Sequence, residues 1–307
     1  MHVIFGTGPL GQAVASELVA RGESVRLVNR SGHLSAKLAG VEVVAGDLTK
    51  VDSARRAVNG ATVVYHCAAG PYTNWQGTLH RLMEGAIDAA ASAGASLVYG
   101  DNLYAYMPSS DPLTEETPER PRTRKGKVRK TVADLLRKAH EDGRVRAAIG
   151  RGSDFYGPGV LASAVGSEVF GRLQQGKTPR VLGNPDQLHS FTYIEDFGRG
   201  LAVLASHPEA LGQTWHIPNA PALSTREFAA RASKAMGKVT KVQTTPAWMI
   251  RALGLFNPMM REVAEMLYEW EQPFVVDHQK FEKAFGKAFG APTPIDRGIL
   301  ETARSFG

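Results

Sequence analysis

The chain has 307 residues, of which 43% are hydrophobic and 21% charged, an ordinary composition for a soluble globular protein. It contains no run of apolar residues long enough for a membrane-spanning helix, and its single cysteine excludes an internal disulfide. The net charge of +6 suits a phosphorylated ligand without requiring nucleic acid. We therefore expect a cytoplasmic protein with no signal peptide and no membrane partner.

The first twelve residues, MHVIFGTGPLGQ, combine a short apolar run with a glycine turn in G-x-G-x-x-G spacing, and a helical pattern follows at once. In a dinucleotide-binding turn Gly6 would allow the bend, Gly8 would let the backbone approach a pyrophosphate, and Gly11 would let helix and strand pack closely. The helix would begin at Pro9, and the N–H groups of its first turn, such as that of Leu10, would face the phosphates. A glycine-rich turn without a nucleotide is the alternative.

A second strand is expected at 24–29, and the sequence Asn29-Arg30-Ser31 stands at its end, 19 residues beyond Gly11 at Arg30. NAD-binding sites usually carry a carboxylate here for the ribose 2′-hydroxyl. A carboxylate would repel a 2′-phosphate, whereas a guanidinium and a hydroxyl can hold it through charge-assisted hydrogen bonds. The sequence therefore predicts NADP(H) as the cofactor. Alternatively, Arg30 only ends an exposed strand.

The third strand is expected at 41–45, a helix at 52–59 and the fourth strand at 62–66. Asp47 could accept from the adenine amino group, with Leu48 packing on the ring, or it could cap the next helix. Cys67, Ala68 and Ala69 are small residues after the fourth strand that would admit a nucleotide ribose. We interpret Cys67 as a small buried residue and not as a nucleophile.

The loop at 71–75 carries Tyr72 and Trp75, which we expect at the edge of a substrate cleft. A helix at 79–94, a fifth strand from residue 96 and a sixth strand at 144–149 continue the alternation. Strands that alternate with helices in this way predict an α/β fold with a doubly wound parallel sheet of the Rossmann type.

The order of these segments resembles the short-chain dehydrogenase/reductase superfamily, in its extended, epimerase/dehydratase-like branch. The glycine turn, Gly46-Asp47-Leu48, the stretch 67–70 and the Tyr-Ala-Tyr after the fifth strand carry the resemblance. Similar motifs recur at 151–159, 189–196 and 212–219. The resemblance implies that Ser153 and Phe155 lie near the nicotinamide.

Members of this branch usually place a Ser or Thr after the fifth strand and a Tyr-x-x-x-Lys pair on the next helix. The tyrosine exchanges a proton with the substrate, and the lysine holds the nicotinamide ribose and lowers the pKa of the tyrosine. In this chain we match the serine position to Asn102, the lysine to Lys130 and the tyrosine to Gly126. The usual proton donor is thus absent from its expected position.

Three accounts of the site follow from that absence. In the first, Tyr104 donates the proton and Asn102 orients the carbonyl; in the second, Lys130 or a water suffices for an activated substrate. In the third, the protein senses NADP(H) without turnover. A nucleotide-sugar epimerase or dehydratase is a weaker reading, because those reactions depend on the missing groups. Packing beneath the substrate loop is the alternative role for Tyr104.

Residues 120–130 hold seven Lys or Arg among 11 positions. We interpret them as cations facing solvent or the cofactor, because no aromatic residues are interleaved to stack on bases. A small molecule is therefore the expected partner and nucleic acid is not, while a homodimer remains open. An acidic or phosphorylated substrate drawn to this run is an alternative.

The C-terminal part is expected to be a smaller, mostly helical substrate domain. Residues 1–160, with 186–205 returning to them, would form the NADP(H) domain, and 161–185 with 206–307 the substrate-binding or lid domain. We expect Asp196 to cap a helix at 197–206 and Ser224 to cap another with Glu227. The Met- and aromatic-rich segment 246–270 reads first as helical core, and a lid or dimer face are the alternatives.

Together these features predict an NADP(H)-dependent oxidoreductase that moves a hydride between nicotinamide and a carbonyl or alcohol of a small, fairly apolar molecule. The sequence does not identify the substrate.

Overall fold

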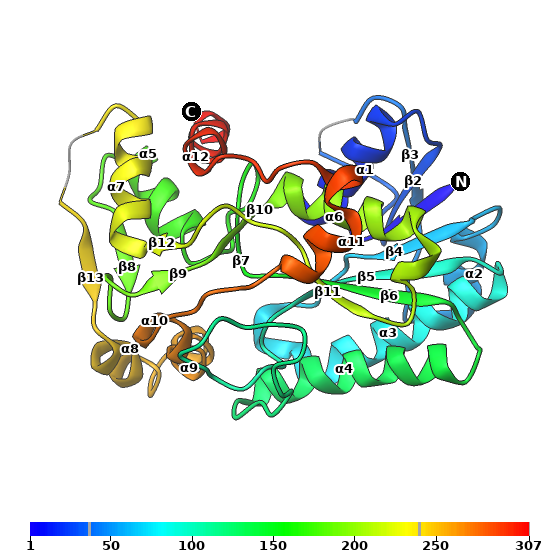
Figure 1. Cartoon of the computed structure of the whole chain (residues 1–307), viewed down its shortest axis with the longest axis horizontal. Helices are drawn as coiled ribbons and strands as arrows, with labels where there is room; N and C mark the ends of the chain where they lie inside the picture. Colours follow the sequence, from blue (N-terminus) through cyan, green and yellow to red (C-terminus); the bar gives the residue numbers. More distant parts are fainter. Residues whose placement is uncertain (36–37, 239–240, 307) are drawn as a thin grey trace.

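A parallel sheet of seven strands forms the centre of the molecule (Figure 1). The computed structural model describes residues 1–35, 38–238 and 241–306. In the described chain the strand order is β11-β6-β5-β4-β1-β2-β3. The strands are β1 (His2–Phe5), β2 (Val25–Asn29), β3 (Val41–Ala45), β4 (Val63–His66), β5 (Ser96–Asn102), β6 (Ala147–Gly152) and β11 (Thr214–His216). This topology confirms the predicted doubly wound α/β fold.

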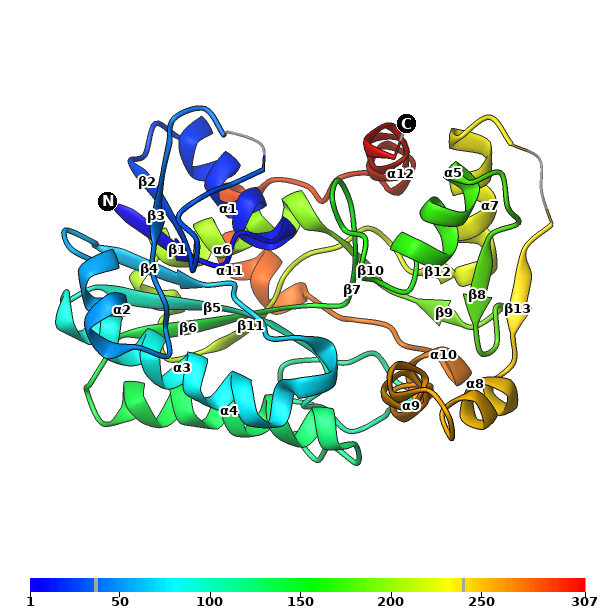
Figure 2. The same cartoon turned by 180° about the vertical axis from the view of Figure 1, so that it is seen from behind.

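Helices cover both faces of the sheet, which explains why β4 is buried along its whole length and β1 from Val3 onward. One face carries α1 (Pro9–Ala20), α6 (Ile194–Ser206) and α11 (Gln279–Phe289), and the other carries α2 (Val51–Ala57), α3 (Trp75–Ser92) and α4 (Arg124–Glu141) (Figures 1 and 2). Each helix buries one apolar side against the strands. Among the described helices, none has the length and apolar character needed to cross a bilayer.

A smaller unit lies beyond the carboxyl ends of the strands, at the end of the molecule away from the N-terminus (Figure 2). Its core contains the rings of Tyr156, Phe170, Phe191 and Phe228. Its strands are β7 (Asp154–Tyr156), β8 (Arg180–Leu182), β9 (Leu188–His189), β10 (Phe191–Tyr193), β12 (Leu223–Ser224) and β13 (Gln243–Thr245). Its helices are η2 (Gly166–Gly171), α5 (Arg172–Gln174), α7 (Thr225–Ala235), α8 (Ala247–Leu253), α9 (Pro258–Glu265), α10 (Tyr268–Glu271) and α12 (Ile295–Ser305).

Two short 3₁₀ helices, η1 (Tyr72–Asn74) and η3 (Pro208–Ala210), complete the elements. Part of the chain beyond residue 206 returns to the main sheet as β11 and α11. The division of the chain into a cofactor domain and a substrate domain remains a prediction.

The expectation that Asp196 caps a helix is wrong. The helix α6 begins at Ile194, so Asp196 lies inside its first turn. Its carboxylate accepts hydrogen bonds from the backbone and hydroxyl of Thr293, both at 2.7 Å, and so fixes the segment before α12. Ser224 does cap α7, because its hydroxyl accepts from the N–H of Glu227 at 3.1 Å.

The segment 246–270 is core only in part. Ile250, Met266, Leu267 and Trp270 are buried as the core reading requires. Six other large apolar side chains of this segment are exposed: Trp248, Met249, Leu253, Leu255, Phe256 and Met259.

Candidate functional site

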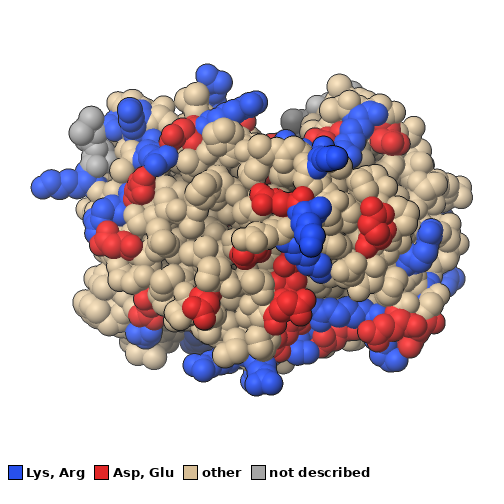
Figure 3. All heavy atoms as spheres, in the orientation of Figure 1, with Lys and Arg blue, Asp and Glu red and all other residues tan. Residues whose placement is uncertain are grey.

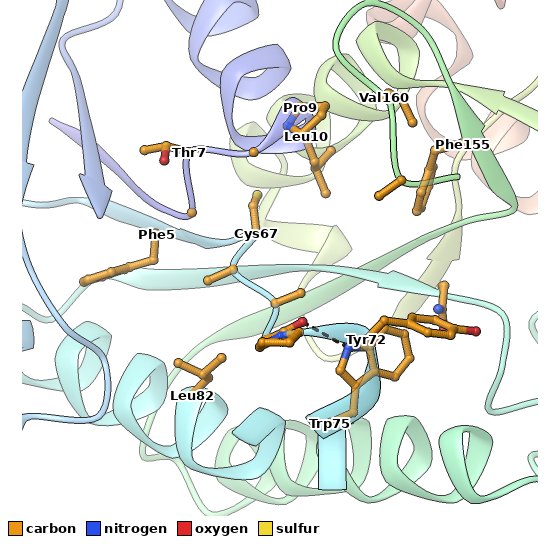
Figure 4. A pocket seen from close by; sticks show the side chains of 18 of the residues that line it. Phe5, Thr7, Pro9, Leu10, Cys67, Tyr72, Trp75, Leu82, Phe155 and Val160 are labelled. Atoms are coloured by element: carbon orange, nitrogen blue, oxygen red, sulfur yellow. Dashed lines mark hydrogen bonds between the residues drawn. The ribbon is translucent and has the colours of Figure 1, made fainter. Parts of the chain in front are cut away.

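A cavity of about 770 Å³ opens at the carboxyl ends of the central strands. It begins at the ends of the neighbouring strands β1 and β4, whose following connections lead to opposite halves of the sheet. This is the usual ligand position in such folds. Figure 4 shows Thr7, Pro9 and Leu10 along one wall, with Tyr72 and Trp75 opposite. It extends from the glycine turn toward the smaller unit, where Phe155 and Val160 line it.

The glycine turn has the geometry that a pyrophosphate needs. Gly6 has a φ of +107°, and a Cβ there would lie 2.7 Å from backbone atoms of Cys67 and Ala68. A Cβ on Gly11 would lie 1.8 Å from the Gly6 carbonyl oxygen, so only glycine lets α1 start this close to the turn. A Cβ on Gly8 would meet no protein atom within 4 Å, and Gly8 lines the cavity. The space at Gly8 is thus left for a ligand.

The end of β2 presents a free cation to the cavity. Asn29 closes the following loop, since its side-chain oxygen accepts from the N–H groups of Ser31 and Gly32 at 3.0 and 2.7 Å. Arg30 is exposed, lines the cavity and forms no ion pair within the described chain. Ser31 is not among the described residues that line the cavity, and its hydroxyl contacts Asn29.

Asp47 and Leu48 line the same end of the cavity. The Asp47 carboxylate accepts from the backbone and hydroxyl of Thr49, and these bonds, with the nearby Arg30, lower its pKa. It does not cap α2, whose N-cap residue is Lys50. Its ionised oxygens remain suited to accept from an amino group.

Small residues after β4 form the floor, as the sequence predicts. Cys67, Ala68 and Ala69 all line the cavity. Burial raises the pKa of the Cys67 thiol to about 12, so it stays protonated at neutral pH and is a poor nucleophile.

Ser153 and Phe155 also lie in the cavity wall. The Ser153 hydroxyl donates to the Ser190 carbonyl at 2.6 Å and therefore holds β7 beside the strands that follow. The Phe155 ring stacks on Phe197 of α6 with centroids 5.1 Å apart, which fixes one of its faces.

Asn102 and Tyr104 meet at the end of β5, where both line the cavity. The Asn102 side-chain oxygen accepts from the Tyr104 N–H at 3.2 Å and shapes the turn. The hydroxyls of Tyr104 and Tyr72 share a hydrogen bond, and burial and the Glu269 carboxyl raise the pKa of Tyr104 well above its usual value. Tyr104 therefore keeps its proton throughout the neutral range.

Lys130 is not brought into this group. Its Nζ donates to Asp134 of the same helix at 2.5 Å. Lys130 is not among the described residues that line the cavity. Gly126 is covered by the Tyr104 carbonyl and Pro121, so no side chain fits there.

The cation that α4 turns toward the cavity is Arg129, one residue earlier, which the sequence reasoning missed. Its Nη1 donates to the Tyr99 hydroxyl at 2.7 Å and to Asp101 at 3.2 Å, and its guanidinium carbon lies 4.2 Å from the Trp75 ring centre. Its Nε is buried and has no hydrogen-bond partner within the described chain. A buried donor left unpaired in this way suits a ligand oxygen.

Arg129 follows Lys125 at the four-residue spacing of the pair sought in the sequence. Lys125 is buried, contacts the Tyr72 carbonyl, lies 3.7 Å over the Tyr72 ring and pairs with Glu262 of α9 at 2.8 Å. It therefore ties the cavity wall at η1 to α9. Matching the helix one residue earlier in the sequence, at Lys125 and Arg129 instead of Gly126 and Lys130, would have located this pair.

A buried acid lies next to Tyr104. Glu269 is 1% exposed, and burial and the negative charge of Asp154 raise its pKa well above the usual value. The Tyr268 hydroxyl donates to Glu269 at 3.3 Å, and Asp154 pairs with His189 at 2.8 Å. His189 is buried and stacks on Trp270.

The profile of the NAD-dependent epimerase/dehydratase family matches residues 3–217, more than two thirds of the chain. The chain belongs to this family. A mouse (Mus musculus) sterol-4-alpha-carboxylate 3-dehydrogenase, decarboxylating, is 23% identical over 99% of this chain and 90% of the relative. A Mycobacterium tuberculosis 3 beta-hydroxysteroid dehydrogenase/Delta 5→4-isomerase is 24% identical over 76% of this chain and 68% of the relative.

Solved structures show the same fold. The Bacillus cereus UDP-N-acetylglucosamine 4-epimerase superposes with a TM-score of 0.79 at 17% identity, covering 99% of this chain and 95% of that one. The Thermus thermophilus UDP-glucose 4-epimerase in complex with NAD also gives 0.79, at 18% identity over 100% and 99%. The family is thus one of nicotinamide-dinucleotide enzymes, and the open space at Gly8 fits such a ligand.

Replacing Gly8 by Ala tests this fit. The new methyl group meets no protein atom, so the melting temperature should stay unchanged, while the dissociation constant for the dinucleotide should rise about tenfold or more because the methyl group overlaps the ligand. Gly286→Ala in α11, which also meets no neighbour, is the matched control and should leave binding unchanged. Titration of dinucleotide fluorescence measures both. Equal affinities of Gly8→Ala and native protein would contradict the assignment.

Proposed function

We propose that the protein is an NADP(H)-dependent oxidoreductase that transfers a hydride between nicotinamide and a carbonyl or alcohol of a small, fairly apolar molecule. The observation that carries this proposal is one continuous cavity that joins the glycine turn and Arg30 to Tyr104. When bound, the cofactor supplies or accepts the hydride. The wall beyond Tyr104, with Trp75, Leu103 and Phe274, suits an apolar substrate, and the sterol dehydrogenases among the relatives support that class.

Arg30 would select the 2′-phosphate. It faces the cavity without an ion-pair partner in the described chain, whereas a carboxylate would be expected there for NAD(H). The residues around it, Asn29, Ser31 and Asp47, hold the loop and the turn beside it in place.

Arg129 would hold the nicotinamide ribose in place of the family's lysine. Its unpaired Nε and its place in the wall support this role. A guanidinium remains charged at all relevant pH values, so Arg129 orients oxygen atoms and does not exchange protons. The proton must therefore come from another group.

Tyr104 would supply the proton to the substrate oxygen in the reducing direction, with Asn102 orienting that oxygen. The hydrogen bond to Tyr72 links Tyr104 to a second phenol, and Glu269 lies close enough to act on both electrostatically. The Glu269 carboxyl, whose pKa burial raises, would serve as a proton reserve beside the phenols. A sensor of NADP(H) without turnover is the second candidate, favoured by the absence of the family's usual tyrosine at residues 125 and 126.

Substituting Arg30 by Asp tests the cofactor preference. Loss of the guanidinium and the new repulsion should weaken NADPH binding about 10- to 100-fold and leave NADH binding equal or stronger. Isothermal titration with both cofactors measures the ratio. The control is Arg55→Asp, at an exposed position of α2. Arg26→Asp is unsuitable because Arg26 is ion-paired with Glu42. An undiminished preference for NADPH in the variant would refute the assignment.

Neighbouring cations of α4 test the ribose assignment. Arg129→Gln should raise the dissociation constant for NADPH about tenfold or more, the value of one charge-assisted hydrogen bond, and Lys130→Gln should leave it within about twofold. Circular dichroism checks that Arg129→Gln folds, and Arg129→Lys should recover part of the affinity. A larger loss of NADPH affinity in Lys130→Gln than in Arg129→Gln would contradict this assignment and support the match to Lys130 made from the sequence.

Tyr104→Phe tests the proton donor. Removing the hydroxyl should lower kcat about 100-fold or more while NADPH binding stays unchanged, because only proton transfer is lost. Tyr106→Phe is the matched control: its hydroxyl bonds to His216 at 2.8 Å, and within the described chain it does not line the cavity. NADPH absorbance is followed against ketosteroids, aliphatic ketones and aldehydes. Tight NADPH binding with no consumption on any of them would favour the sensor.

A further inference from the structure

The turn between α8 and α9 projects apolar side chains into solvent. Phe256 is 89% exposed, Leu255 71% and Trp248 66%. Leu253, Met249 and Met259 widen the same apolar surface, which we call the α8–α9 tip. Exposed apolar surface concentrated in this way is uncommon on a protein that stays alone in water.

The tip is held in one conformation by its own backbone. The N–H groups of Phe256 and Asn257 donate to the Leu253 carbonyl at 3.1 and 2.9 Å. Asn257 caps α9, and the Arg261 guanidinium donates to the Gly254 carbonyl at 3.2 Å. These bonds leave Leu255 and Phe256 outside, so their exposure is built into the fold.

Uncompensated cations lie in the segment that leads into α4 and in the first turn of that helix. Arg120, Arg122 and Lys127 are exposed and form no ion pair within the described residues. They belong to the run that leads into α4, and α4 is joined to α9 through Arg124 and Glu262 at 3.3 Å. Figures 1 and 2 place α8, α9 and the start of α4 along one lower edge of the molecule, and Figure 3 shows Lys and Arg on that edge beside a largely uncharged corner.

We propose that this edge binds the surface of an anionic lipid bilayer, with the α8–α9 tip inserted among the lipids and the cations on the headgroups. Projecting aromatic and aliphatic side chains flanked by basic residues are what such an interface binds. A second copy of this chain fits less well, because it would bring the same cations and a further net charge of +6 to the contact.

This inference departs from the expectation of no membrane partner, which rested on the absence of a spanning segment. It does not depend on hydride transfer. The helix that follows the tip nevertheless reaches the cavity wall, since α9 packs beside η1 and Lys125 joins Glu262 of α9 to the carbonyl of Tyr72, which lines the cavity. An apolar substrate held in the lipid would thus lie close to the site.

Sedimentation of the full chain with phosphatidylcholine vesicles, with and without phosphatidylserine, tests the proposal. The native protein should bind the anionic vesicles. The double variant Leu255→Ser, Phe256→Ser should bind about tenfold or more weakly, because two apolar side chains no longer enter the lipid. Replacing Arg120, Arg122 and Lys127 by Ser should remove the preference for phosphatidylserine, by about fivefold for each cation.

Val51→Ser is the matched control, since Val51 is 48% exposed on α2, away from this edge, and should leave binding unchanged. Thermal melts check that all variants fold. Absence of native binding, or equal binding of the tip variant, overturns the proposal. So does a dimer in sedimentation velocity that becomes monomeric in the tip variant without vesicle binding, which would assign the tip to self-association.

Discussion

The close approach of α1 to the first strand is the constraint on which the rest of the site depends. Gly11 lets the helix begin against the Gly6 carbonyl, and Gly198 of α6 lies where a Cβ would be 2.6 to 2.8 Å from Ala13 and Val14 of α1. The two helices are therefore fixed at backbone contact, a fit that allows no added methyl group. Since α6 follows directly on β10, which pairs with β7, the position of the glycine turn also sets that of Asp154 and Phe155. Cofactor end and substrate end are one packed unit.

Charge is distributed along this unit in a way that separates binding from proton transfer. Arg30 and Arg129 face the cavity, and Arg129 shares Asp101 with the wholly buried Arg151. Burying Arg129 and Arg151 is tolerable because carboxylates and phenols pair with most of their donors. Arg129 Nε and Arg151 Nη2 have no partner among the described residues, and of these two residues Arg129 lines the cavity. At the far end the groups near Tyr104 are phenols and acids whose pKa values burial raises. Permanent cations thus line one part of the cavity, and groups whose pKa values burial raises lie at the other.

The sequence predicted most of the sheet, and it predicted that the glycine turn, Arg30 and the small residues after β4 lie together, because these features depend on local patterns. The glycine spacing, Asn29-Arg30 and the small residues at 67–69 are contiguous signals, and the structure gathers them in one cavity. On α4 the family's lysine was matched to Lys130, whereas the residue that lines the cavity is Arg129. Successive side chains of a helix point about 100° apart, so an error of one residue replaces a cavity residue by one outside the cavity. Asp196 was misread for another reason: its partner, Thr293, is distant in sequence and leaves no local pattern.

The replacement of the family's Tyr-x-x-x-Lys by Lys125-x-x-x-Arg129 changes what the helix does without moving it. Lys125 no longer reaches a substrate; it binds η1 to α9 through the Tyr72 carbonyl and Glu262. The aromatic residues of η1 and α3 then close over both cations, with Trp75 4.7 Å from Lys125 and 4.2 Å from Arg129. The same exchange that removes the usual proton donor therefore creates the wall on which Tyr72 meets Tyr104. In the function proposed above, the phenol of Tyr104 transfers the proton beside Tyr72, which Lys125 of the helix holds in place through its carbonyl.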